Sequence, residues 1–299
     1  MNDINDLGTS NPLIEETPFQ RKTKAVRRAL AKNPIMGAGI VVVIFFVLVA
    51  FAAPLITPVG PKEINPINRL QPPGGEHWFG TDTLGRDVFT RTVYGTRISL
   101  MVGFLVALIT MVFGSIIGVI VGYFRKVDAV LMRVMDGLMA IPTLLLAIAL
   151  VAAIGASVQN VIISLVVVET PRMSRLIRAS PLSLREQTFV EAARGIGASS
   201  IRVMALHIFP NTIAPLIVQG TFICATAILI EAGLSFLGAG TPPENASWGN
   251  MMSEGRSYIE IAVWMITFPG IALTLAILGI NLAGDGLRDA LDPKLARRM

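Results

Sequence analysis

The chain has 299 residues, of which 53% are hydrophobic and only 15% are charged. Soluble domains carry about 25% charged residues, so this composition excludes a water-soluble globular protein. The formal net charge of +5 does not indicate a nucleic-acid partner, because basic residues gather in the cytoplasmic loops of membrane proteins.

The first 33 residues are polar and precede the first apolar run. Residues 1–20 show turn-forming residues, no periodicity and mixed charge, which is typical of a disordered tail. Residues 21–32 hold six basic residues directly before the apolar run, and such clusters stay in the cytoplasm. We therefore expect residues 1–33 to form a cytoplasmic N-terminal tail rather than a cleaved signal peptide.

Six stretches are apolar enough to cross a bilayer, whose hydrocarbon core needs about 20 helical residues. The predicted spans are residues 35–56, 98–124, 134–154, 158–178, 212–237 and 259–283. The fourth is the least regular, because its apolar centre is short and is followed at once by Glu169 and Pro171. The sequence thus predicts an all-α membrane protein with six transmembrane helices.

The distribution of Lys and Arg predicts the orientation of these spans. With the N-terminus inside, nineteen of the 25 basic residues fall on the cytoplasmic side and six on the other side. This asymmetry favours an N-in/C-in topology. The expected units are residues 34–97 (first span and extracytoplasmic loop), 98–284 (core transmembrane domain) and 285–299 (cytoplasmic C-terminal tail).

The sequence offers few groups for chemistry. Cys224 is the one cysteine, and His77 and His207 are far apart in the sequence, so we expect no disulfide and no metal site. We also expect no catalytic and no cofactor-binding residue in this chain.

The nearest match to a phosphate-binding G-x-x-x-x-G-K-S/T motif is GTDTLGRD, residues 80–87. Arg86 and Asp87 replace the Lys and the Ser or Thr that hold phosphate and magnesium. We expect instead an ordered extracytoplasmic loop in which Asp82, Arg86 and Asp87 make local ion pairs.

Ionisable residues inside the predicted spans are candidates for a substrate path, because a charge in lipid costs roughly 3 kcal/mol or more. For Asp136 and Glu169 we favour structural ion pairs, with Arg133 and Arg172 respectively. A small-residue face on the second span is better explained by close helix packing than by a ligand; it consists of Gly114, Gly118 and Gly122.

Gln219 and Glu231 lie in the fifth predicted span. Ser235 follows Glu231 by one helical turn and can hydrogen-bond its carboxylate. For Glu231, lining of a substrate path and structural anchoring are therefore equally supported.

A polar stretch, EAARGIGASSIRVMALHIFPN, residues 191–211, lies in the longest predicted cytoplasmic loop between spans. Ser183 and Glu186 fit a capping box, which places a helix start near residue 184. Gly195 and Gly197 are expected to end this helix, because glycine adopts the left-handed conformation of a helix stop.

A second short helix is expected to follow, capped by Ser199 or Ser200 and ended by Pro210. The predicted apolar stripes are Phe189, Ala192, Ala193 and Ile196 on the first helix, and Ile201, Met204, Ala205 and Ile208 on the second. This pattern alone permits a solvated connector, a DNA-binding helix–turn–helix, a phosphate loop or a docking element. A DNA-binding helix–turn–helix is disfavoured because the segment is fixed between two membrane spans. A phosphate loop is disfavoured because no Lys follows the glycines.

The segment resembles the EAA loop of permease subunits of bacterial ATP-binding cassette importers. The family pattern is E-A-A, three residues, G, nine residues, I, one residue, L-P. The matches in register are Glu191, Ala192, Ala193, Gly197 and Pro210. His207 and Phe209 depart from the pattern, standing where the family has Ile and Leu. Residues 180–211 are below called the EAA loop.

Three further stretches are similar to the peptide/nickel branch of this family, the dipeptide and oligopeptide permease "C" subunits: residues 79–100, 231–251 and 284–295. The resemblance implies a type I importer permease fold. It also implies that the five matched residues couple the chain to an ATPase subunit, which binds the ATP and magnesium. The implied partners are a second permease subunit in a heterodimer, two ATPase subunits and an extracytoplasmic substrate-binding protein.

The expected function is translocation of di- or oligopeptides across the bacterial inner membrane, with energy from the ATPase subunits. An alternative is the same machinery importing nickel or another small solute, such as an opine or a modified sugar. A secondary transporter would be expected to show internal repeats or buried coupling-ion sites, and the sequence indicates neither. An intramembrane hydrolase is more remote, because no histidine lies within a predicted span.

Overall fold

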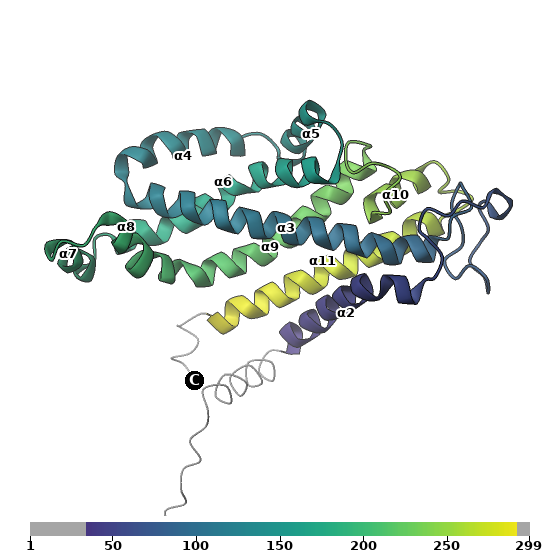
Figure 1. The fold of residues 1–299 in the computed structure, drawn as a ribbon, viewed down its shortest axis with the longest axis horizontal. Helices are drawn as coiled ribbons and strands as arrows, with labels where there is room; N and C mark the ends of the chain where they lie inside the picture. The colour runs from purple at the N-terminus through teal and green to yellow at the C-terminus, as the bar shows by residue number, and fades with distance from the viewer. Residues whose placement is uncertain (1–33, 292–299) are drawn as a thin grey trace, which may run out of the picture.

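The long helices of the computed structural model run side by side in one elongated bundle (Figure 1). The structure describes residues 34–291. The predicted N-terminal tail, with its six basic residues, and residues 292–299 of the predicted C-terminal tail lie outside this part. Within residues 34–291, β-structure is limited to an isolated bridge between Thr81 and Asp87.

The α-helices in chain order are α2 (Pro34–Ile56), α3 (Val88–Tyr123), α4 (Arg125–Met139), α5 (Thr143–Ile154), α6 (Val158–Leu184), α7 (Thr188–Gly195), α8 (Ser200–Val203), α9 (Ile213–Phe236), α10 (Trp248–Arg256) and α11 (Trp264–Leu291). Three short elements complete the set: the 3₁₀ helices η1 (Pro66–Asn68) and η3 (Phe209–Thr212), and the π-helical turn η2 (Met204–Ile208).

The all-helical membrane class is confirmed. Four helical stretches are long and apolar enough to cross a membrane: Pro34–Ile56, Val88–Tyr123, Ser200–Phe236 and Trp264–Leu291. α4 and α5 meet the same criterion only together, and they bend by 94° where they join. α6 occupies the fourth predicted span but carries several charges, so the count of six spans and their orientation remain predictions.

The predicted spans are accurate for α2 and α9, but the second span is wrong at its outer end. α3 begins at Val88, ten residues before the predicted start. Asp87 caps the helix by accepting a hydrogen bond from the Thr90 N–H at 2.7 Å. The predicted span starts after the charged Arg97, whereas the helix continues outward through Arg97 and through Arg91, which the structure buries with 1% exposure.

Two other boundaries differ from the prediction. The third predicted span is two helices that meet at Pro142, since the residue before a proline is pushed out of helical conformation. The last span begins at Trp264 rather than residue 259, and α10 lies in the loop that precedes it.

Close packing between α3 and α6 confirms the predicted role of the small-residue face. A Cβ atom added to Gly118 would lie 2.7 Å from the Ser174 carbonyl oxygen and 2.8 Å from the Ile177 Cβ. Gly114 and Gly122 are equally close to α6. The two backbones can therefore approach one another only because these positions carry no side chain.

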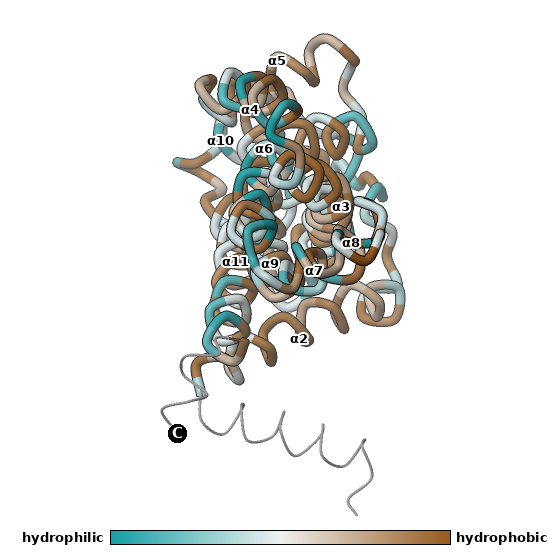
Figure 2. The backbone as a smooth tube through the Cα atoms, turned by 90° about the vertical axis from the view of Figure 1, so that its left-hand side faces the viewer, coloured by the Kyte–Doolittle hydropathy of each residue, from teal (hydrophilic) through white to brown (hydrophobic). Residues whose placement is uncertain are grey.

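The two ends of the bundle differ in structure. α7 and α8 lie at one end, whereas α10 and the loop of residues 57–87 lie at the opposite end (Figure 1). Figure 2 shows α2 as almost wholly hydrophobic, whereas α7 and α8 mix hydrophilic and hydrophobic residues. The EAA loop and the loops around α10 are thus separated by the length of α3.

The glycine face allows a matched test. We expect Gly118→Ala to lower the free energy of unfolding by about 1–3 kcal/mol, because the added methyl group overpacks the α3–α6 contact. Gly137→Ala is the control, since a Cβ there meets nothing within 4 Å and alanine favours a helix by up to about 1 kcal/mol. Thermal unfolding in detergent measures both, and equal melting temperatures would contradict the packing argument.

Candidate functional site

The first helix of the EAA loop, α7, starts later than predicted. α6 continues through Ser183 to Leu184, and Gln187 is the N-cap of α7. Glu186 does not close a capping box; its carboxylate pairs with Arg125 at 3.3 Å. The reason is tertiary, because α6 packs on α3 as far as Pro181, and this contact carries the helix past its local start signal.

The end of α7 follows the prediction. Gly197 has φ +89°, the left-handed region that favours glycine. Its N–H donates to the Arg194 carbonyl at 2.9 Å, and the Ala198 N–H donates to the Ala193 carbonyl at 3.0 Å. These two bonds form a Schellman motif, with Gly197 at the left-handed position. Ser199 then caps α8 by accepting from the Arg202 N–H at 3.3 Å.

The apolar stripes of the loop are rotated from their predicted positions. Val190 and Ala193 are the buried residues of α7, whereas Phe189 and Ile196 are 44% and 88% exposed. On the second helix Ile208 is buried, whereas Ile201 is exposed. The buried residues join the core of the bundle. Glu191 and Ala192 consequently lie on an exposed outer face.

The prediction that Pro210 ends the second helix is wrong. α8, η2 and η3 lead directly into α9, so that residues 200–236 form one helical stretch. Pro210 lies in the first turn of η3, where a missing N–H is tolerated. His207 lies in the π-helical turn, and its ring centroid is 6.1 Å from that of Phe189 on α7.

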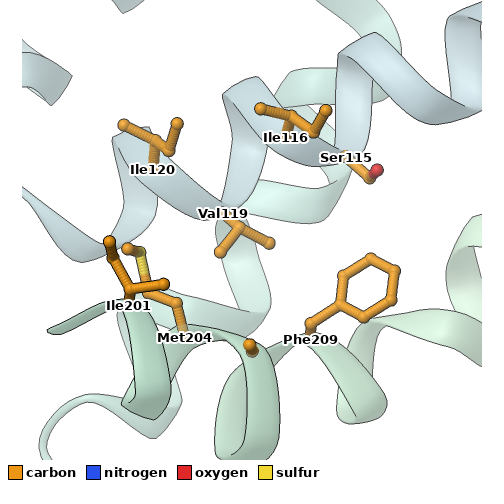
Figure 3. Close-up of a pocket in the computed structure, with 8 residues that line it drawn as sticks. Ser115, Ile116, Val119, Ile120, Ile201, Met204 and Phe209 are labelled. Carbon is orange, nitrogen blue, oxygen red and sulfur yellow. The ribbon is translucent and has the colours of Figure 1, made fainter. Parts of the chain in front are cut away.

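A shallow apolar groove lies between α3 and the second helix of the loop (Figure 3). Its volume is about 270 Å³, and its lining residues are Ser115, Ile116, Val119, Ile120, Ile201, Met204, Ala205 and Phe209. The Ser115 hydroxyl donates to the Val112 carbonyl within its own helix at 3.0 Å. The groove therefore offers packing surface and no reactive group.

The two polar residues of the fifth predicted span have different surroundings. Gln219 lines a groove of about 460 Å³ between α6, α9 and α11, together with Arg288. Glu231 is fully buried, and the Ser235 hydroxyl donates to its carboxylate at 2.9 Å, as predicted. Ser99 on α3 lies 3.5 Å from the other carboxylate oxygen.

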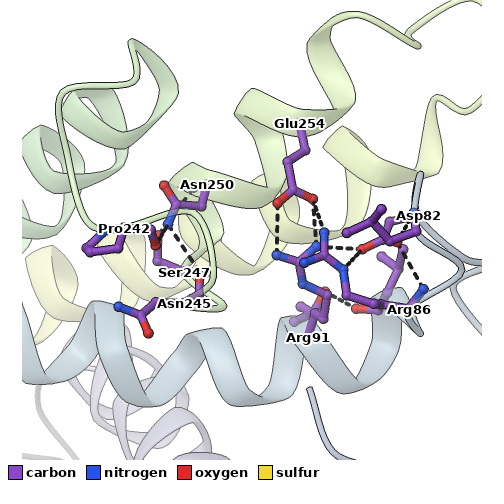
Figure 4. Close-up of polar contacts among 11 residues, drawn as sticks. Asp82, Arg86, Arg91, Pro242, Asn245, Ser247, Asn250 and Glu254 are labelled. Carbon is purple, nitrogen blue, oxygen red and sulfur yellow. Dashed lines mark hydrogen bonds and ion pairs between the residues drawn. The ribbon is translucent and has the colours of Figure 1, made fainter. Parts of the chain in front are cut away.

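A cluster of four charged side chains lies at the end of the bundle that carries α10 (Figure 4). Arg91 on α3 makes a bidentate contact with Glu254 on α10, at 2.6 and 3.1 Å, and reaches Asp82 at 2.5 Å. Arg86 binds Asp82 at 2.6 Å and Glu254 at 2.7 Å. Two positive and two negative charges thus compensate one another, and the cluster fastens the 80–87 loop and α10 to α3.

The predicted local pair between Asp82 and Arg86 is therefore confirmed, but it is part of a larger cluster that the sequence did not indicate. Asp87 does not join it. In addition to capping α3, Asp87 lies 3.0 Å from the His77 ring nitrogen. Arg91 and Glu254 are 163 residues apart, so no local pattern could have linked them.

Ion pairs also hold α4 against α6. Asp136 pairs with Arg175 rather than with the predicted Arg133, because α6 lies alongside α4. Arg178 on α6 binds Asp128 on α4 through two contacts of 2.5 and 2.6 Å. The pair between Glu169 and Arg172 is confirmed at 3.1 Å.

Sequence reasoning also missed the residue that supports the EAA loop. Tyr123, at the inner end of α3, contacts Arg194 of α7 and Ser200 of α8. Its aromatic ring directly before a predicted loop was the only available signal. Among residues 34–291, no group of His, Cys, Asp and Glu is arranged to hold a metal ion.

Two known families match the chain. Residues 110–297 match the family described as "Binding-protein-dependent transport system inner membrane component". Residues 23–73 match the "N-terminal TM domain of oligopeptide transport permease C".

Several curated proteins are similar over most of the chain. A putative peptide transport system permease protein of Brucella abortus is 50% identical over 90% of both chains. The dipeptide transport system permease protein DppC of Alkalihalophilus pseudofirmus is 46% identical, covering 90% of this chain and 88% of its own. A glutathione transport system permease protein of Pectobacterium atrosepticum is 39% identical over 90% of both chains.

The fold is similar to a solved chain of the MetNI methionine ABC transporter in an inward-facing conformation. The TM-score is 0.55 at 21% identity, and the match covers 68% of this chain and 98% of that chain. This likeness supports the type I importer permease architecture.

The charged cluster of Asp82, Arg86, Arg91 and Glu254 makes a prediction about stability. Arg91→Met leaves the buried Asp82 carboxylate with one compensating cation fewer, so we expect a loss of about 3–5 kcal/mol in the free energy of unfolding. Arg125→Met is the control, because it breaks a pair whose side chains are 78% and 64% exposed, and such pairs contribute about 0–1 kcal/mol. Thermal unfolding of both purified variants is the measurement. Similar melting temperatures would show that the cluster does not stabilise the fold.

Proposed function

Because the chain belongs to the family of inner membrane components of binding-protein-dependent transport systems, it is a multi-pass permease subunit of a bacterial ATP-binding cassette importer, and we propose that it translocates di- or oligopeptides. The observation that carries the proposal is the 46–50% identity to permeases named for peptide or dipeptide transport, over 90% of the chain. Within residues 34–291 the buried carboxylates are either ion-paired, as Asp82 and Glu169 are, or bonded to hydroxyl groups, as Glu231 is. Nickel, opines and modified sugars remain alternatives that no structural observation favours.

The EAA loop is proposed as the site that couples this chain to an ATPase subunit. Its outer face presents the exposed Glu191 and Ala192, which offer a carboxylate for charge-assisted hydrogen bonds beside a small side chain that permits close approach. Gly197 fixes the turn that follows, with open space around its Cα. Ala193 faces inward and supports the loop, and Pro210 lies where the loop joins α9.

The energy source is proposed to be separate. The sequence has no G-x-x-x-x-G-K-S/T motif, and the charged groups of the 80–87 loop are compensated by one another. ATP and magnesium would therefore be bound by two partner ATPase subunits. A second permease subunit, forming a heterodimer with this chain, and an extracytoplasmic substrate-binding protein complete the proposed assembly.

The polar residues of α9 are proposed to have distinct roles. Glu231 is sealed among Ser99 and Ser235 and has no exposed surface, which supports an anchoring role between α3 and α9. Gln219 lines an open groove together with Arg288, which supports contact with a substrate on its way to the cytoplasm.

The substrate proposal predicts a selective transport defect. Deleting the gene should abolish uptake of labelled di- to tetrapeptides that enter through this importer, while nickel uptake stays at the parental level. Complementation with the intact gene should restore peptide uptake. Unchanged peptide uptake together with lost nickel or opine uptake would replace the proposed substrate class.

The coupling proposal predicts the effect of reversing one charge. We expect Glu191→Lys to weaken association with the ATPase subunits by about tenfold or more, because a contacting charge is reversed. Glu186→Lys is the control, since that exposed carboxylate precedes α7 and pairs with Arg125. Co-purification of tagged ATPase subunits with membranes of each variant gives the answer. Equal retention would remove Glu191 from the docking surface.

The turn after α7 allows a second matched pair. Gly197→Ala places a side chain at φ +89° and costs about 1–2 kcal/mol in the native turn, so we expect reduced peptide uptake. Gly195→Ala introduces the same methyl group into equally open space without a positive φ, and uptake should be normal. Uptake assays in a deletion strain compare them, and equal activity would show that the turn geometry is dispensable.

A further inference from the structure

Tyr123 is the last residue of α3, and both short helices of the EAA loop contact it. The Arg194 Nε–H donates to the Tyr123 hydroxyl oxygen at 3.2 Å, and the centre of the Arg194 guanidinium lies 4.9 Å from the ring centroid. The hydroxyl in turn donates to the Ser200 Oγ at 3.4 Å. A phenol can accept one bond while it donates another, so both contacts are made at once.

The partners of Arg194 make this contact specific. Within the described part of the chain, no carboxylate lies within ion-pair distance of Arg194, so the face and hydroxyl of Tyr123 are its main polar contacts. Arg194 lies in the last turn of α7, between the inward-facing Ala193 and the helix end. Its contact with Tyr123 therefore fixes α7 relative to α3.

Tyr123 itself is well held. Its side chain belongs to the core cluster that also contains Val190, Ala193 and Val203 of the EAA loop, and the residue is 8% exposed. One residue earlier, the Gly122 carbonyl accepts a hydrogen bond from Arg185 at 3.1 Å. The end of α3 at Tyr123 thus receives polar contacts from Arg185, which precedes α7, and from Arg194 and Ser200 at and after the end of α7.

The opposite end of α3 is fixed just as firmly. Arg91 ties it to Glu254 of α10, and the Trp248 indole N–H donates to the Thr92 carbonyl at 3.1 Å. Between these ends α3 is one uninterrupted helix of 36 residues. A displacement of the EAA loop at Tyr123 would therefore be carried along α3 to α10.

We propose that Tyr123, which contacts both Arg194 and Ser200, is a positioning residue. It would transmit movement of the EAA loop to α3 and, through α3, to α10 at the opposite end of the bundle. This proposal rests on the coupling function proposed above for the EAA loop. Arg194 serves as the link between the ATPase-facing surface and the transmembrane bundle, rather than as part of that surface.

Conservative substitutions separate the contacts. Tyr123→Phe keeps the ring and its packing but removes the hydroxyl that joins Arg194 to Ser200. Arg194→Lys keeps a cation for the ring but loses the planar guanidinium with its Nε donor. Arg194→Ala removes both. Arg202→Ala removes the same charge from α8, where the Arg202 side chain makes no hydrogen bond or ion pair within the described residues and only its backbone N–H is bonded, to Ser199.

The test uses the complete importer, with both permease subunits, the ATPase subunits and the binding protein, reconstituted in liposomes. The readout is labelled di- to tetrapeptide taken up per ATP hydrolysed, with ATPase co-purification measured in parallel. We expect Arg194→Ala to lower this ratio by about tenfold, within the usual range of coupling between sites. Arg194→Lys and Tyr123→Phe should be intermediate, and Arg202→Ala normal. ATPase association and basal hydrolysis should persist in all four variants.

The outcomes distinguish the transmission role of Tyr123 and Arg194 from the docking role proposed for the EAA loop. Equal ratios for Arg194→Ala and Arg202→Ala would overturn the transmission role. Loss of ATPase association in Arg194→Ala would also overturn it, because Arg194 would then belong to the docking surface. Normal ATPase association in Glu191→Lys would instead remove Glu191 from the proposed docking surface, so the two proposals fail through different variants. Should Arg194→Ala fail to fold, the comparison of Arg194→Lys and Tyr123→Phe with Arg202→Ala decides the question.

Discussion

The contact on which the rest of the bundle depends is the close approach of α3 and α6. Lipid provides no hydrophobic force between helices, so their association relies on dispersion between tightly packed backbones. Gly114, Gly118 and Gly122 provide this fit along the inner half of α3. Because α6 continues almost directly into α7, and α3 ends at Tyr123 beside α7, the same contact decides where the EAA loop lies.

Charge compensation is the second constraint. Arg91 and Asp82 are almost completely buried, and each is paired with an opposite charge. Glu231 is enclosed by hydroxyl groups instead. These side chains are engaged within the fold and are therefore not available as free acids or bases. Exposed polar side chains such as Glu191 remain at the ends of the bundle, where partner proteins would bind.

Several features that depend on neighbouring residues were predictable from the sequence, although the local helix signals at Ser183 and Pro210 failed. Contacts between charged side chains on distant elements were not predictable. The hydrophobic centres of α2 and α9, the stop at Gly197 and the Glu169–Arg172 pair each arise within a few residues of chain. Asp136 was assigned to Arg133 because the sequence could not show that α6 brings Arg175 closer. The same limit explains the missed Arg91–Glu254 contact and the rotated stripe of α7, whose buried side is chosen by the bundle core.

That rotation has a mechanical consequence. If the apolar stripe of α7 faced a partner, the loop would be a loosely tethered docking peptide. Instead Val190 and Val203 are fully buried in the cluster that also contains Leu165 of α6 and Val106 of α3. The loop is therefore a rigid extension of the transmembrane helices, because moving it alone would expose these side chains to water. A partner that displaces the outer face at Glu191 must consequently displace the bundle with it.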